Sequence, residues 1–148
     1  MRILLLYASA GGGHKRAAQA MEAYFREHLP GAEVRVEDAL RHVGRAVNAL
    51  CCDGYKFSAK HAPQIFGTLY RSTNRDPKFA ALLPRVNGML ARKLLPLIEE
   101  FRPDVILDTY HFAGQMVSRL KEKGLVSAPL VNVVTDYGPH MAWLAPEV

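Results

Sequence analysis

Hydrophobic residues along the chain follow two periodicities in turn. Residues 2–8 form an almost continuous apolar run that ends in a serine, an alanine and three glycines, which is typical of a central strand buried on both faces. Residues 14–29 then repeat apolar side chains at helical spacing until Pro30 and Gly31. Residues 32–38 alternate with period two and carry charges on one face, which predicts a strand nearer a sheet edge. The opening of the chain therefore predicts a βαβ unit.

The same alternation returns towards the end of the chain. Residues 104–108 predict a short apolar strand, and residues 112–123 predict a helix that ends at Gly124. Residues 129–136 predict another buried strand. Strands that alternate with helices indicate an α/β fold with a doubly wound, mostly parallel, Rossmann-like sheet. A length of 148 residues suits one such domain.

The middle of the chain, about residues 41–101, has a different composition. Between residues 41 and 93 there are ten cations and two acids, a local excess of +8, whereas the whole chain carries +5. Aromatic and aliphatic residues alternate with these charges, and prolines divide the stretch into short helices. We therefore expect a basic, amphipathic insertion in a single domain. Its candidate residues for contact with a membrane or lipid acceptor are Tyr55, Phe66, Tyr70, Arg71 and Arg75.

Two interpretations of this insertion stay open. The aromatic side chains either pack inward beneath a solvated cationic face, or they form an interfacial surface on anionic lipid head groups. Nucleic acid is the weaker alternative, because no recognition helix, zinc finger or RNA-binding motif accompanies the charge. We expect no nucleic-acid partner.

Overall composition excludes several classes of protein. With 49% hydrophobic and 22% charged residues, the chain is neither disordered nor fibrous. Its apolar opening is far shorter than the roughly 20 residues of a membrane-spanning helix and lacks a secretory cleavage signature, so we expect a cytoplasmic location. Cys51 and Cys52 are adjacent, which suits reduced thiols better than a disulfide or a structural zinc site. We expect no bound metal.

The three glycines after the first predicted strand are a candidate phosphate site. Gly11, Gly12 and Gly13 allow a ligand to approach the backbone at the positive end of a helix dipole. Arg16 stands where the dinucleotide fingerprint needs a small residue, and the P-loop pattern is absent. NAD and ATP are therefore disfavoured as ligands.

Several polar side chains follow the predicted strands and should meet at their carboxyl edge. His14 opens the first helix, where the helix dipole favours a neutral imidazole that can act as a base, although a lone histidine is often only a surface residue. Tyr110 and His111 follow the next strand, and Thr135 and Asp136 end the last. Because ligands bind at this edge of α/β sheets, we interpret these five residues as one candidate site.

Two of the candidates at the end of the chain have a second interpretation. Asp136 either orients a histidine or a sugar hydroxyl, or it caps a loop. Trp143, the only tryptophan, is either a lipid-facing anchor or part of the core.

Two motifs carry a resemblance to a known family. Residues 9–18 read Ser-Ala-Gly-Gly-Gly-His-Lys-Arg-Ala-Ala, and residues 134–143 read Val-Thr-Asp-Tyr-Gly-Pro-His-Met-Ala-Trp. The chain thereby resembles the N-terminal domain of monogalactosyldiacylglycerol synthases and bacterial diacylglycerol glucosyltransferases, in glycosyltransferase family 28. Residues 55–74 and 103–107 extend the likeness to essentially the whole chain.

The resemblance implies the acceptor half of a two-domain GT-B enzyme. Such an enzyme transfers a hexose from a UDP-sugar to the 3-hydroxyl of diacylglycerol, with inversion and without a metal or cofactor. His14 would be the base and Asp136 would orient groups in the cleft, whereas Gly11, Gly12 and Gly13 would contact the donor diphosphate. The insertion would meet an anionic membrane at the inner face of the cell membrane.

The chain ends at Val148, where the resemblance implies a second, nucleotide-sugar domain. We therefore expect the 148-residue chain to bind lipid or membrane without turnover. A non-catalytic lipid-binding or membrane-binding module is the alternative, and a transferase acting on another lipid-linked acceptor is a third.

Overall fold

The computed structural model describes residues 1–9, 12–44, 49, 88–136 and 141–148. The described residues contain a four-stranded sheet in the order β2-β1-β3-β4, and every neighbouring pair is parallel. The elements are β1 (Arg2–Tyr7), α1 (Gly13–His28), β2 (Glu33–Asp38), α2 (Ala39–Val43), α6 (Leu95–Phe101), β3 (Val105–Asp108), α7 (His111–Glu122), β4 (Leu130–Asn132) and a 3₁₀ turn, η1 (Met141–Trp143). The predicted doubly wound α/β fold is confirmed.

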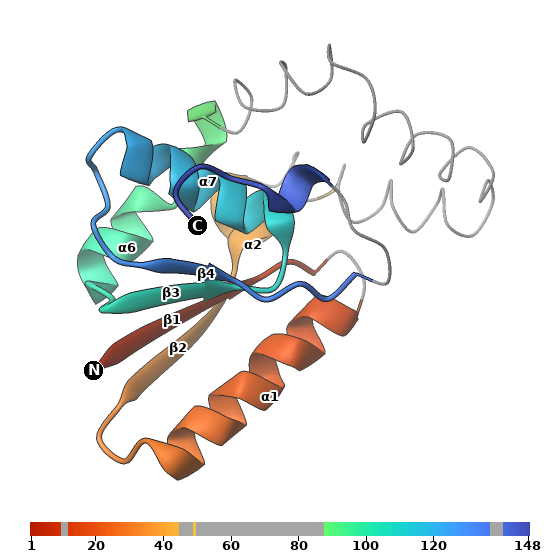
Figure 1. Cartoon of the computed structure of the whole chain (residues 1–148), viewed down its shortest axis with the longest axis vertical. Coiled ribbons are helices and arrows are strands. Elements are labelled where there is room, and N and C mark those ends of the chain that lie inside the picture. Colours follow the sequence, from red (N-terminus) through yellow and green to blue (C-terminus); the bar gives the residue numbers. More distant parts are fainter. Residues whose placement is uncertain (10–11, 45–48, 50–87, 137–140) are drawn as a thin grey trace, which may run out of the picture.

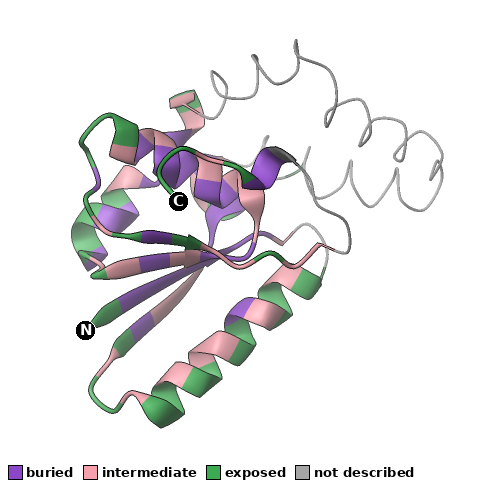
Figure 2. Cartoon of the chain, viewed as in Figure 1, coloured by how far each residue is buried: buried purple, intermediate pink, exposed green. Residues whose placement is uncertain are grey.

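Helices cover the two faces of the sheet unequally. α1 packs on one face, where Ile3, Leu5 and Val34 are buried, and Figure 1 shows it as the single labelled helix on that side. α2, α6 and α7 cover the other face, which holds the larger cluster. Figure 2 shows the resulting difference in burial between the two helices. About half of α7 is buried, whereas Ala18 is the one buried residue of α1.

The predicted elements agree closely with the observed ones except at the last strand. β1, α1, β2, β3 and α7 begin and end within one or two residues of their predicted bounds. Gly31 and Gly124 take left-handed φ angles of 86° and 68°, as the turns after α1 and α7 require. The predicted buried strand over residues 129–136 was wrong in extent, since β4 ends at Asn132 and Val131 is 44% exposed.

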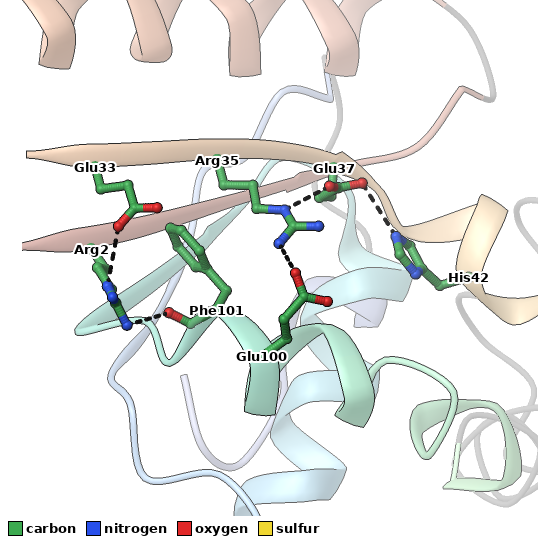
Figure 3. A network of polar contacts seen from close by, with 7 residues as sticks. All are labelled: Arg2, Glu33, Arg35, Glu37, His42, Glu100 and Phe101. Carbon is green, nitrogen blue, oxygen red and sulfur yellow. Dashed lines mark hydrogen bonds and ion pairs between the residues drawn. The ribbon is translucent and has the colours of Figure 1, made fainter.

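The charged face of β2 is covered rather than left to solvent. Figure 3 shows the Arg35 guanidinium between Glu37 and Glu100, with both hydrogen bonds at 2.8 Å, while His42 lies 3.3 Å from Glu37. Burial raises the pKa of Glu37, but its hydrogen bonds to Arg35 and His42 outweigh this and lower the pKa overall. β2 is an edge strand, as predicted, and α6 completes its polar face.

The stretch predicted as an insertion, about residues 41–101, includes residues of the α/β core. α2 contributes Leu40 and Val43 to the main core, and the α6 region contributes Leu94, Ile98 and Phe101. The basic and aromatic candidates between residues 50 and 87 lie outside the described residues. Both ends of the predicted insertion are therefore part of the α/β core.

Candidate active site

The strand order places the candidate site between β1 and β3. The order reverses at this pair, so the chain leaves β1 through α1 on one face and leaves β3 through α7 on the other. Open α/β sheets bind ligands outside the carboxyl ends of the strands at such a switch point. His14 follows β1 and Thr109 follows β3, so both residues lie at this edge.

The half-buried imidazole of His14 contacts two groups from later parts of the chain. Its Nδ1 lies 2.6 Å from the carbonyl oxygen of Thr109 and 2.7 Å from Oγ1 of Thr135. Because a carbonyl oxygen only accepts hydrogen bonds, Nδ1 carries the proton. In the neutral imidazole the lone pair is then on Nε2. The structure therefore identifies Nε2 as the nitrogen of His14 that can accept a proton.

Two threonines hold the surroundings of His14 together. Oγ1 of Thr109 donates to the carbonyl oxygen of His14 at 2.9 Å, and Oγ1 of Thr135 donates to the carbonyl oxygen of Thr109 at 3.1 Å. Thr109 is fully buried, and its N–H donates to Leu6 at 3.0 Å, which extends the contact between β1 and β3. The start of α1, the end of β3 and the segment after β4 are thus tied together.

A series of aromatic rings connects this site to the end of the chain. The rings of His14 and Tyr110 lie 4.9 Å apart, and those of Tyr110 and His111 lie 4.7 Å apart. His111 meets Trp143 edge to face at 5.7 Å. The structure therefore brings Tyr110 and His111 to His14, as the sequence predicts, and their roles in substrate binding stay a prediction.

Asp136 and Trp143 are partners of each other. The indole N–H of Trp143 donates to Oδ2 of Asp136 at 2.7 Å, and Trp143 is only 7% exposed. Of the two interpretations of Trp143, its burial agrees with a core position and not with an exposed anchor, and a role of Trp143 in acceptor contact stays a prediction. Asp136 lies next to Thr135, but its carboxylate is bound by the indole and not by His14.

The glycines at the start of α1 face open space. Gly12 is the N-cap residue and Gly13 the first residue of the helix, and the described structure has no atom within 4 Å of where a Cβ would lie at either position. Packing therefore does not require glycine there, and the first-turn N–H groups lack intrahelical partners. Gly11 lies outside the described residues, and phosphate binding by the three glycines stays a prediction.

A fully buried carboxyl group lies directly behind the site. Asp108 ends β3, and burial raises its pKa to about 8, although the N–H groups of Tyr110 and Gly114 oppose the shift. Its partner in the sheet register is Asn132, whose Nδ2 donates to the carbonyl oxygen of Trp143 at 2.8 Å. The sequence pattern gives no role to Asp108, Thr109 or Asn132. The position of Asp108 and Thr109 at the end of a predicted strand was the available signal.

The part of the chain that the structure describes has neither a membrane-spanning helix nor a metal-binding cluster. Within it, no helix is long and apolar enough to cross a membrane, and no group of three or more His, Cys, Asp or Glu side chains is arranged to hold a metal ion. The predicted membrane-contact residues Tyr55, Phe66, Tyr70, Arg71 and Arg75 lie outside it.

Comparison with known proteins identifies the family. The sequence model described as monogalactosyldiacylglycerol (MGDG) synthase matches residues 14–148. The chain belongs to this MGDG synthase family. The match begins at His14 and includes Thr109, Thr135 and Asp136, so it contains the residues that meet at the carboxyl edge. The predicted family is confirmed.

Several curated proteins similar to this MGDG synthase family member come from Staphylococcus aureus. Proteins named processive diacylglycerol beta-glucosyltransferase, from Staphylococcus aureus strains JH9, Newman and JH1, are each 27% identical over 146 residues. The aligned region is 98% of this chain but 36% of each relative, so the chain spans about a third of their length. No solved structure matches the chain.

Proposed function

We propose that this chain is the acceptor-binding domain of a lipid glycosyltransferase with GT-B architecture. The whole enzyme transfers a hexose from a UDP-sugar to diacylglycerol, with inversion at the sugar. The relatives' names support the reaction class and the lipid acceptor. The observation that carries the proposal is His14, whose Nδ1 is held by Thr109 and Thr135 while Nε2 is left to accept a proton.

His14 acts as the general base in this proposal. Nε2 takes the proton from the acceptor hydroxyl as its oxygen bonds to the anomeric carbon of the sugar, and the bond between that carbon and the UDP oxygen breaks. The imidazolium that forms donates from Nδ1 to the carbonyl oxygen of Thr109, which stabilises its charge. The same contact fixes the orientation of the ring before the reaction.

The remaining groups at this edge bind substrate. The N–H groups around Gly11, Gly12 and Gly13 receive the departing diphosphate, since helix N-termini favour anions. Tyr110, His111 and Thr135 surround the acceptor, and Asp136 orients its hydroxyl groups or those of the sugar. In this proposal the transfer uses neither a metal ion nor a cofactor.

A second domain completes the enzyme in this proposal. It holds most of the nucleotide-sugar, so the 148-residue chain alone binds acceptor without turnover. The basic, aromatic segment with Tyr55, Phe66, Tyr70, Arg71 and Arg75 attaches the protein to the anionic inner face of the cell membrane. Transfer of sugar by the purified chain alone would contradict this division of roles.

Replacement of His14 in the full-length enzyme tests the proposal. We expect His14→Ala to lower kcat with diacylglycerol by at least about 100-fold, the usual loss for a general base, while binding to anionic vesicles is unchanged. His28→Ala is the matched control, because His28 lies on the same helix but is exposed in its last turn. Turnover by His14→Ala at close to the parent rate would remove His14 from the mechanism.

A membrane-binding module without catalysis is the second candidate, and the charge of +5 favours it. Flotation of the chain with anionic and with neutral vesicles, at low and high salt, measures this property. Binding to anionic vesicles that salt weakens supports membrane attachment. If the full-length protein binds vesicles and transfers sugar from no UDP-hexose, the function is membrane binding and the transferase proposal is wrong.

A further inference from the structure

Three buried oxygen atoms behind the site are poorly paired, since the N–H groups of Tyr110 and Gly114 act on Asp108 without forming hydrogen bonds of normal geometry. They are Oδ1 and Oδ2 of Asp108 and Oδ1 of Asn132, and none has a hydrogen-bond partner of normal geometry. Asp108 is fully buried. An ionised Asp108 would repel the Asn132 oxygen, and buried acceptors without good hydrogen bonds cost a folded protein free energy. A proton at this position removes the conflict.

The fold brings these oxygens to one point. Asp108 and Asn132 are register partners on β3 and β4, so their side chains project from the same face of the sheet, towards α7. α7 presents Gly114 there. A Cβ at Gly114 would lie 2.6 Å from Oδ1 of Asn132 and 2.8 Å from Oδ1 of Asp108. The absence of a side chain at Gly114 therefore makes room for both polar groups.

The orientation of the Asn132 amide follows from its other contact. Nδ2 lies 2.8 Å from the carbonyl oxygen of Trp143, and a carbonyl oxygen requires a donor. The amide oxygen must then be the atom that faces Gly114 and Asp108. Since Oδ1 of Asn132 accepts only, a hydrogen bond between the two side chains requires a proton on Asp108.

The contacts continue from Trp143 to the neighbourhood of His14. The Trp143 indole N–H donates to Asp136 at 2.7 Å, and the adjacent Thr135 contacts Nδ1 of His14 at 2.7 Å. Gln115 of α7 also donates to the carbonyl oxygen of Ala142 at 2.7 Å, which holds η1 on the same helix. A continuous set of contacts thus runs from the core to His14.

We propose that Asp108 is a protonated carboxylic acid that donates to Oδ1 of Asn132, and that it is the buried end of a hydrogen-bond relay through Asn132 and Trp143 to Asp136. In this relay Asp108 is a positioning residue, since it holds the segment that carries Thr135 and Asp136 against His14. The importance of that segment for catalysis rests on the proposed function, whereas the relay itself does not.

The surroundings of Asp108 agree with a neutral acid. Burial raises its pKa to about 8, and no charged side chain is among the causes of the shift. Its neighbour on β1 is Leu6, and its neighbour on β4 is Asn132. At the carboxyl edge, the titratable groups on the neighbouring elements are Tyr7 at the end of β1, His14 on α1, Tyr110 and His111 at the start of α7, and Asp136 after β4.

The relay makes the environment of Trp143 depend on pH. Above about pH 8, Asp108 ionises and its oxygens repel Oδ1 of Asn132. The amide must then move, so Nδ2 loses the Trp143 carbonyl oxygen and η1 loosens from β4. Because Trp143 is the only tryptophan of the chain, its emission reports this change without any substrate.

A fluorescence titration of the 148-residue chain between about pH 6 and pH 10 tests the relay. We expect the emission of Trp143 to shift to the red by several nanometres, with a midpoint near 8. Infrared difference spectra over the same range should show the loss of one protonated carboxyl band. A flat emission profile through this range would overturn the proposal.

Two substitutions of matched charge identify the group. Asp108→Asn keeps the shape and supplies an N–H donor to Asn132, so we expect the transition near pH 8 and the infrared band to disappear. Asp104→Asn, at the exposed opposite end of β3, should leave both unchanged. A transition that persists in Asp108→Asn belongs to another group and refutes the assignment.

A third variant tests the link through Asn132. Asn132→Ala removes both hydrogen bonds, so Trp143 should emit at the red-shifted wavelength throughout the range, with circular dichroism confirming the fold. If Asn132→Ala emits at the same wavelength as the parent below pH 8, Asn132 does not connect Asp108 to Trp143 and the relay is refuted at this residue. None of these readouts uses transfer activity, so the proposed function and the relay can fail separately.

Discussion

At the scale of single residues, the candidate site depends on which nitrogen of His14 carries a proton. His14 and Thr135 are separated by 121 positions, and Thr109 lies between them in the chain. Only after folding does the Thr109 carbonyl oxygen select the protonated Nδ1. The sequence identifies the histidine, whereas the structure identifies the atom.

Thr135 should contribute measurably to this arrangement. In the full-length enzyme we expect Thr135→Val to lower kcat about fivefold, because loss of one hydrogen bond costs about 1 kcal/mol and the Thr109 contact remains. Thr135→Ser keeps the hydroxyl and should stay near the parent rate. Equal kcat values for the valine variant and the parent would show that Thr135 does not orient His14.

At the scale of elements, the close approach of α7 to β3 and β4 organises the site. α7 begins directly after Tyr110 and packs Ala113, Met116 and Val117 into the main core. Gly114 lets the helix lie against the polar ends of both strands. α7 therefore joins the hydrophobic core to the carboxyl edge where His14 lies.

Gly114→Ala should separate α7 from the sheet. Its Cβ would lie 2.6 to 3.0 Å from the Asn132 and Asp108 oxygens, so we expect a loss of about 1–3 kcal/mol in the free energy of unfolding, measured by urea denaturation. Gly13→Ala is the matched control, because it is also helical and has open space around it. That control should be neutral or slightly stabilising. Equal stability of the two variants would show that Gly114 is not a packing constraint.

At the scale of the whole molecule, the site exists because the strand order reverses between β1 and β3. The two connections then leave on opposite faces, so residues 14, 109 and 135 meet above the strand ends. The same sheet buries Asp108 completely. The architecture that creates the site therefore also places an ionisable group in the core, and the stability of the domain depends on it.

Stability should fall as pH rises because of Asp108. Its pKa is about 8 in the folded protein and 3.8 when it is not perturbed, so between these values the folded state holds a proton that the unfolded state has released. Asp108 alone therefore contributes no cost to folding below about pH 4, and its cost grows with pH and is complete above about pH 8. Asp108→Asn removes this cost, which reaches about 4 kcal/mol at pH 7.

Urea denaturation at several pH values measures this effect. The free energy of unfolding of Asp108→Asn should exceed that of the parent by an amount that grows with pH and levels off above about pH 8. Asp104→Asn is the control, since its carboxylate is exposed and should show no such growth. A constant difference between Asp108→Asn and the parent across this range would mean that Asp108 is ionised in the folded protein.

The sequence by itself determined the elements and the edge at which they end. Apolar periodicity located β1, α1, β2, β3 and α7, because local spacing decides which faces are buried. The same periodicity predicted β4 to be longer than it is, since the point at which the chain leaves the sheet, after Asn132, depends on contacts with distant residues. The N–H of Val133 donates to the carbonyl oxygen of Asp108, and Nδ2 of Asn132 donates to the carbonyl oxygen of Trp143. Oγ1 of Thr135 contacts Nδ1 of His14.

Tertiary structure alone decided the chemistry at that edge. The tautomer of His14, the burial of Trp143 and the raised pKa of Asp108 each depend on atoms from distant parts of the chain. A sequence pattern places a residue on a strand or a helix, but the burial of a polar group and its hydrogen-bond partners are set only when the elements pack. For this reason Asp136 and Trp143, predicted as separate functional residues, are partners in the folded domain.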